Sequence, residues 1–165
     1  MTAQVLALRR PDLISSLCLV STTCFGAEGR PRWEKRVASL RAGEPFDAML
    51  EPMMERWLSM KFRRENVQRY EQIKSMVLRT PREGYIGCGL AIIGFDIRHR
   101  LKEIDAPVLV VAGEEDPSTT VEHAQMIQAG IRDAELVVMS GARHLLNVDD
   151  RAVFTAHLTD WLASH

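Results

Sequence analysis

The sequence has few of the features that mark membrane, secreted or nucleic-acid-binding proteins. No apolar run approaches the roughly 20 residues that span a bilayer, and the first residues do not form a charged start followed by a long apolar stretch. We therefore expect neither a membrane partner nor a signal peptide. The formal net charge is only -1, so no strong field directs the chain to nucleic acid or acidic lipid. The one basic run, at 30–36, favours the start of a solvated helix over a nucleic-acid surface.

Cysteine is scarce, and histidine lacks the spacing of metal ligands. The three cysteines, Cys18, Cys24 and Cys88, form no CxxC pair and cannot all pair with one another. This pattern is typical of reduced thiols in a cytoplasmic protein. The five histidines are scattered along the chain, which argues against a zinc site. We expect a cytoplasmic protein without a bound metal.

What is present indicates an α/β protein. The 165 residues, 46% hydrophobic and 26% charged, are enough for one soluble globular domain with a real core. Short apolar runs predict strands at 14–21, 107–112 and 134–139, and helical spacing predicts helices at 1–10, 121–131 and 151–162. The runs at the centres of the first two strands are uninterrupted, which suits strands buried on both faces. Such alternation is typical of a doubly wound parallel sheet.

The middle of the chain breaks this alternation. Residues from about 33 to about 94 are rich in Met, Arg, Glu and Leu and contain the turn signals Gly43-Glu44-Pro45 and Thr80-Pro81. We expect three or four short helices here and no strand, an insertion typical of a cap. The predicted organisation is therefore a core segment at 1–31, a helical cap at 32–96 and the rest of the core at 97–165.

Polar residues follow two successive predicted strands. The strand at 107–112 runs into "GEEDP", which contains Asp116, and the strand at 134–139 runs into "SGARH", which ends at His144. Ligands of parallel sheets bind beyond the carboxyl ends of the strands. Alone, an Asp-Pro after a strand is more typical of a turn, and a lone loop histidine is usually structural. Together they indicate a carboxylate that orients an imidazole, which can then deprotonate a nucleophile.

With these residues in this order, the chain resembles the α/β-hydrolase fold family, whose triad runs Ser, then Asp or Glu, then His. The segment "VLVVAGEEDP" matches the strand-and-acid motif. The resemblance gives the acid role to Asp116, with Glu114 and Glu115 as neighbouring competitors. The segment "SGARHLLNVDD" matches the histidine loop, which makes His144 the general base. The leading "MTAQVLALRRPDLISSLCLVST" resembles the helix after the nucleophile and the next strand.

The nucleophile is the main departure from the family's pattern. The G-x-S-x-G elbow should lie immediately before Met1, and the sequence does not contain it. Ser21, Ser59 and Ser140 lack flanking glycines in the right pattern, and no cysteine has a strand-turn-helix context. We expect that the chain corresponds to about the second half or two-thirds of the family's domain, and that a segment outside this sequence supplies the serine.

Within the family, the chain is most similar to the 3-oxoadipate enol-lactonases. The cap segments "MMERWLSMKF" at 53–62 and "LRTPREGYIGCGLAI" at 78–92 carry this likeness, with Ser118-Thr119-Thr120 and "HLLNVDD". It implies hydrolysis of an enol-lactone with a free carboxylate, in the β-ketoadipate pathway of aromatic catabolism. Arg56 and Trp57 are the candidates that would bind this carboxylate, through a guanidinium and an indole N–H. The equal alternative is that Trp57 packs in the cap core and Arg56 is solvated.

Two functions of different class follow. The first is a cofactor-independent ester or lactone hydrolase that acts on a small carboxylate-bearing substrate. The second is a non-catalytic fragment that acts only through association. In the family's topology, Leu17–Val20 pairs with the strand at 108–112 on one side and with a strand absent here on the other. Such an apolar edge favours self-association or pairing with a complementing N-terminal half.

Overall fold

A computed structural model describes all residues of the chain, 1–165. The chain divides into two compact units. The sheet unit comprises Met1–Cys24 and Ile97–His165, and the helical unit comprises Phe25–Asp96. No helix in either unit is long and apolar enough to cross a membrane.

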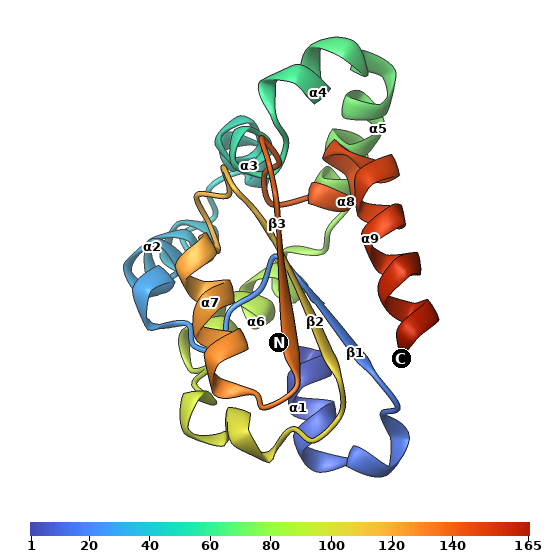
Figure 1. Cartoon of the computed structure of the whole chain (residues 1–165). Helices are drawn as coiled ribbons and strands as arrows, with labels where there is room; N and C mark the ends of the chain where they lie inside the picture. Colours follow the sequence, from blue (N-terminus) through green and yellow to red (C-terminus); the bar gives the residue numbers. More distant parts are fainter. The chain divides into compact units, whose positions relative to one another are not determined.

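The sheet unit is built on a parallel sheet of three strands (Figure 1). They are β1 (Leu17–Val20), β2 (Val108–Gly113) and β3 (Ala134–Met139), in the order β1-β2-β3. Leu17 aligns with Val108, and Val108 aligns in turn with Ala134. The α/β fold class predicted from the sequence is confirmed, and so is the pairing of the Leu17–Val20 strand with the strand after residue 107.

Helices connect and cover these strands. They are α1 (Thr2–Arg9), α7 (Val121–Gly130), α8 (Leu146–Asp149) and α9 (Arg151–Ser164), with the 3-10 turns η1 (Pro11–Leu13) and η4 (Arg98–Glu103). Helix α7 packs on one side of β2 and β3, and α9 lies on the opposite side (Figure 1). The sequence did not predict α8, which is a single turn directly after the histidine loop.

Burial follows each strand's place in the sheet. Every residue of β2 is buried, as its apolar run predicts for a central strand. The same prediction is wrong for one face of β1. Leu17 and Leu19 are buried, whereas Cys18 and Val20 are only partly covered. The difference arises because β1 is an edge strand with β2 as its only neighbour.

One hydrophobic core cluster of the sheet unit joins the sheet to its C-terminal helices. Leu109 and Val111 of β2 pack with Leu146 of α8 and Trp161 of α9, and each of these side chains is at most 5% exposed. The indole Nε1 of Trp161 also donates a hydrogen bond of 3.0 Å to Oε1 of Glu135 on β3. This packing fixes the chain on either side of the loops that follow β2 and β3.

The helical unit contains five α-helices rather than the predicted three or four. They are α2 (Arg30–Arg41), α3 (Leu50–Trp57), α4 (Met60–Glu65), α5 (Val67–Leu78) and α6 (Arg82–Ile93), with the 3-10 turns η2 (Ala27–Gly29) and η3 (Phe46–Met49). The breaks that divide this stretch into more helices than predicted have local causes. Leu58 is extended, and the Ser59 hydroxyl then caps α4 by accepting a bond from Phe62 N. Asn66 leaves the helical region with φ −125° and separates α4 from α5.

The helical unit has its own small core. Val37 and Leu40 of α2 pack against Ile86 of α6, and Trp33 lies over Gly89, where an added Cβ would come within 2.9 Å of the indole. Phe25 and Asp96, the first and last residues of this unit, form an isolated antiparallel bridge. The bridge joins the two ends of the unit to each other.

Candidate active site

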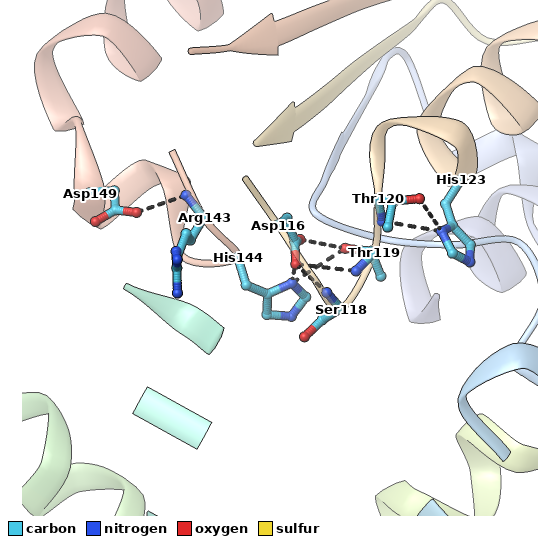
Figure 2. Close-up of polar contacts among 8 residues, drawn as sticks. All are labelled: Asp116, Ser118, Thr119, Thr120, His123, Arg143, His144 and Asp149. Atoms are coloured by element: carbon cyan, nitrogen blue, oxygen red, sulfur yellow. Dashed lines mark hydrogen bonds and ion pairs between the residues drawn. The ribbon is translucent and has the colours of Figure 1, made fainter. Parts of the chain in front are cut away.

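Asp116 and His144 meet beyond the carboxyl ends of two neighbouring parallel strands. Asp116 lies in the loop after β2, and His144 lies in the loop after β3. Oδ2 of Asp116 is 2.7 Å from Nδ1 of His144 (Figure 2). The structure therefore brings together the two residues that the sequence predicted as acid and base. Their separation is that of a direct charge-assisted hydrogen bond.

The Asp116 carboxylate is buried, at 3% exposure, and each of its oxygens accepts hydrogen bonds. Oδ1 accepts from the backbone N–H groups of Ser118 at 2.7 Å and Thr119 at 3.2 Å. Oδ2 accepts from the Thr119 hydroxyl at 2.7 Å and from His144. The donors from Ser118 and Thr119 belong to the loop of Asp116 itself, and His144 adds one from the loop after β3, so the orientation of the carboxylate is set before any substrate arrives.

The same contacts decide the charge of the acid. Burial by itself opposes ionisation of Asp116. The hydrogen bond from His144, the positive charge of His144 when protonated, and the bonds from Thr119 and Ser118 together outweigh it, and they hold the pKa of Asp116 below its ordinary value. The carboxylate is therefore ionised at neutral pH and acts only as an acceptor.

An ionised partner determines which nitrogen of His144 carries the proton. Because the carboxylate can only accept, Nδ1 of His144 donates to it, and in the neutral ring the lone pair then resides on Nε2. The side chain of His144 is 24% exposed, whereas that of Asp116 is fully covered. A base with its orienting acid buried behind it and its reactive ring partly accessible is the arrangement that nucleophilic acyl transfer needs.

Comparison with known proteins identifies the family of this chain. Residues 1–150 match the family described as the alpha/beta hydrolase fold. The chain belongs to the α/β-hydrolase fold family. This confirms the resemblance drawn from the acid and histidine motifs.

Among the relatives of this hydrolase-family chain are enol-lactonases. It is 28% identical over 154 residues to 3-oxoadipate enol-lactonase 2 of Acinetobacter baylyi. The aligned region covers 93% of this chain and 57% of the relative. The chain is similar in structure to the enol-lactonase from Burkholderia xenovorans LB400, with TM-score 0.91 and 25% identity over 98% of this chain and 61% of that one. A hydrolase from Pseudomonas aeruginosa PA01 gives TM-score 0.89 and 29% identity over 97% and 60%. The chain therefore spans about three-fifths of their length, as the predicted partial hydrolase fold requires.

The two glutamates beside the acid of this hydrolase fold have other partners. Glu114 accepts bonds from the Ser140 hydroxyl at 2.7 Å and from Gly141 N at 3.0 Å. Glu115 forms an ion pair of 3.6 Å with Arg143. Both residues thus tie the acid loop to the histidine loop, while Asp116 is the carboxylate that bonds to His144.

The histidine loop of the hydrolase fold is held at both ends. Gly141 has φ +66°, a left-handed conformation that suits glycine, and it turns the chain directly after β3. Beyond it, Arg143 N donates to Oδ2 of Asp149, the last residue of α8, at 2.8 Å (Figure 2). The loop backbone is therefore fixed on either side of His144.

The serines considered as nucleophiles have varied local roles. Ser59 caps α4 and Ser140 bonds to Glu114. Ser21 directly follows β1 with φ 43°, a strained value for a residue with a side chain. The three cysteines are free thiols, with Cys24 buried and Cys88 exposed. The serine expected from a segment outside this sequence stays a prediction.

The two predicted binders of a substrate carboxylate lie in the helical unit. Arg56 and Trp57 are the last residues of α3, and both are partly buried. Their binding role stays a prediction. One residue of the acid loop was missed: Thr119, whose hydroxyl contacts both Asp116 and His144. The available signal was partial: an aspartate in a turn accepts from the backbone N–H two residues on, here that of Ser118, which brings the next residue close to the carboxylate.

Proposed function

We propose that this chain carries the acid–base half of a serine-type hydrolase that cleaves carboxylic esters or enol-lactones. The observation that carries the proposal is the 2.7 Å contact between a buried, ionised Asp116 and a partly exposed His144. Family membership supports it. The serine would come from a segment outside this sequence, and the reaction needs no metal or cofactor.

The chemistry follows from the proton positions. Nε2 of His144 takes the proton of the serine hydroxyl as its oxygen adds to the lactone carbonyl. Asp116 stabilises the imidazolium that forms. When the ring C–O bond breaks, the imidazolium returns its proton to the enolate oxygen that leaves. Water, deprotonated by the same imidazole, then hydrolyses the acyl-enzyme and releases the carboxylic acid and the free serine.

For the substrate, we propose an enol-lactone with a free carboxylate, from the aromatic catabolism of the β-ketoadipate pathway. The relatives named as 3-oxoadipate enol-lactonases support this class. Arg56 and Trp57 are the proposed carboxylate binders, because a guanidinium pairs bidentately with a carboxylate and an indole offers an N–H donor. We also propose a cytoplasmic location, in keeping with the three free thiols.

The test combines the chain with the part of a related enol-lactonase that precedes the matched region, and measures turnover of an enol-lactone. His144→Ala should abolish turnover, and Asp116→Asn should lower it by orders of magnitude. His157→Ala, which changes an exposed histidine of α9, is the matched control. The chain alone should be inactive towards an activated ester. Turnover that persists in the His144→Ala variant would contradict the proposed function.

The substrate class needs a separate comparison. Arg56→Ala should raise KM for a carboxylate-bearing lactone more than KM for a neutral ester, because only the first substrate loses an ion pair. Equal effects on both substrates would exclude Arg56 from carboxylate binding.

A second candidate function is association without catalysis, and the edge position of β1 favours it. Under that alternative, the combined protein would assemble and show no turnover.

A further inference from the structure

The Thr119 hydroxyl lies between the acid and the base. Its Oγ1 is 2.7 Å from Oδ2 of Asp116 and 3.3 Å from Nδ1 of His144. Asp116 Oδ2 and His144 Nδ1 are themselves 2.7 Å apart. Three polar atoms from three side chains therefore form a closed triangle (Figure 2).

The direction of each bond in the triangle is determined. The carboxylate only accepts, so the hydroxyl donates its single proton to Oδ2 of Asp116. The lone pairs of Oγ1 then face the Nδ1–H of His144. The imidazole proton is thus shared between a main acceptor at 2.7 Å and a weaker one at 3.3 Å. Rotation of the ring would lose both acceptors at once.

We propose that Thr119 is a positioning residue of the active site, which acts through Asp116 and His144. This inference rests on the proposed function, because positioning matters only if the pair transfers protons. The hydroxyl has two effects. It fills an acceptor site on Oδ2 of Asp116, so the carboxylate stays ionised despite its burial. It also gives the Nδ1–H of His144 a second acceptor, so the ring keeps Nε2 turned towards the reacting hydroxyl.

The competing interpretation is that the hydroxyl only closes the loop after β2. The backbone N–H groups of Ser118 and Thr119 already do this through Oδ1 of Asp116, at 2.7 and 3.2 Å. The hydroxyl goes instead to Oδ2, the oxygen that His144 uses. A purely structural role would leave the titration of Asp116 and the state of the His144 ring unchanged when the hydroxyl is removed.

The first test uses the chain as it is. The carboxyl carbon of Asp116 and the ring nitrogens of His144 are followed by NMR against pH in wild type, Thr119→Val and Thr119→Ser. Thr119→Val should move the Asp116 titration to higher pH, because one donor to the carboxylate is lost. Thr119→Ser keeps the hydroxyl and should titrate like wild type. A Thr119→Val titration that coincides with wild type, in a protein that stays folded, would overturn the inference.

Ser140→Ala is the matched control. It removes a hydroxyl–carboxylate bond of the same length, 2.7 Å, which runs from Ser140 in the loop after β3 to Glu114 in the loop after β2, without touching Asp116 or His144. It should leave the Asp116 titration where it is in wild type. A shift as large as that of Thr119→Val would show that any loosening of these loops has the same effect, and it would overturn the specific role of Thr119.

The second test measures turnover in the chain combined with the part of a related enol-lactonase that precedes the matched region. Thr119→Val should lower kcat by about tenfold or more with little change in KM, as expected for a lost bond to a charged group. Thr119→Ser should restore most of kcat. In an Asp116→Asn background, Thr119→Val should have almost no further effect, because residues that act as one unit are not additive. A full additional loss in that background would contradict action through Asp116. If His144→Ala were active, the proposed function would fail, while the NMR result would still decide the placement of Thr119.

Discussion

Oδ2 of Asp116 lies 2.7 Å from Nδ1 of His144, although the two residues are 28 positions apart in the chain. The contact forms because β2 and β3 are parallel neighbours, aligned from Val108 with Ala134 to Gly113 with Met139. Their loops therefore leave the sheet side by side. The backbone continues this pairing, since Glu115 N donates to Ala142 O at 3.0 Å. The geometry of the pair depends on how closely these two loops approach.

Gly113→Ala should disturb this approach. A Cβ on Gly113 would lie 2.5 Å from the carbonyl oxygen of Ala142 and 2.6 Å from that of Arg143. Both are backbone atoms, so the histidine loop would have to move. We expect a loss of stability of about 1–3 kcal/mol, as for other overpacked sites, together with loss of the Asp116–His144 bond. Thermal unfolding and the NMR signals of His144 measure the two effects.

Gly87→Ala is the control for that substitution. Gly87 lies inside α6, and nothing is within 4 Å of an added Cβ. Alanine there should stabilise the chain by about 0.5–1 kcal/mol through helix propensity. Equal destabilisation by both changes would contradict the contact between Gly113 and the histidine loop.

The stability of the chain should fall in acid partly because of Asp116. Its pKa in the folded chain lies below the ordinary value of 3.8. A group with a depressed folded pKa stabilises the fold above its unfolded pKa and loses that contribution as the pH falls through the folded pKa. The free energy of unfolding of wild type, measured with denaturant, should therefore decrease below about pH 4. The free energy of unfolding of Asp116→Asn, whose side chain cannot titrate, should decrease less over the same pH range. Parallel pH profiles for the two proteins would refute the ionised state of Asp116.

Leu146→Ala should be strongly destabilising, because Leu146 is fully buried in the core of the sheet unit. The expected loss is about 2–5 kcal/mol, from lost burial and the cavity that remains. Leu162→Ala on α9 should cost less than about 0.5 kcal/mol, because Leu162 is 51% exposed. Chemical denaturation of both variants measures the difference. Similar losses at the two positions would contradict the packing of α8 beneath the histidine loop.

The chain by itself should associate through the open edge of β1. Leu17 N and Ser21 N donate to Pro107 O and Val111 O of the neighbouring strand. The N–H of Cys18, between them, therefore points away from β2 in a parallel ladder. Cys18→Pro would block pairing at this edge without removing a bond to β2. Light scattering on dilute protein should show a larger assembly for wild type than for Cys18→Pro, with unchanged circular dichroism. A monomeric wild type would refute the association.

Local sequence was enough for the parts of this protein that depend on short-range physics. The apolar runs around Leu17 and Val108 specified strands because extended backbone suits β-branched and aliphatic residues buried by a sheet. The order of Asp116 and His144 after two such strands specified an acid–base pair, because the ends of parallel strands meet at one edge. Residues 1–150, which include both loops, match the family described as the alpha/beta hydrolase fold.

The breaks at Leu58 and Asn66 are also local, but they come from single residues in a stretch that is helical in composition, and so the predicted count of helices was wrong. Tertiary structure alone decided the rest. The partial exposure of Cys18 depends on β1 being at the edge of the sheet, which apolar content cannot reveal. The contact of Thr119 with His144 crosses between two loops. Sequence spacing encodes neighbours along one element, whereas contacts between elements depend on strand order and on the direction of each side chain.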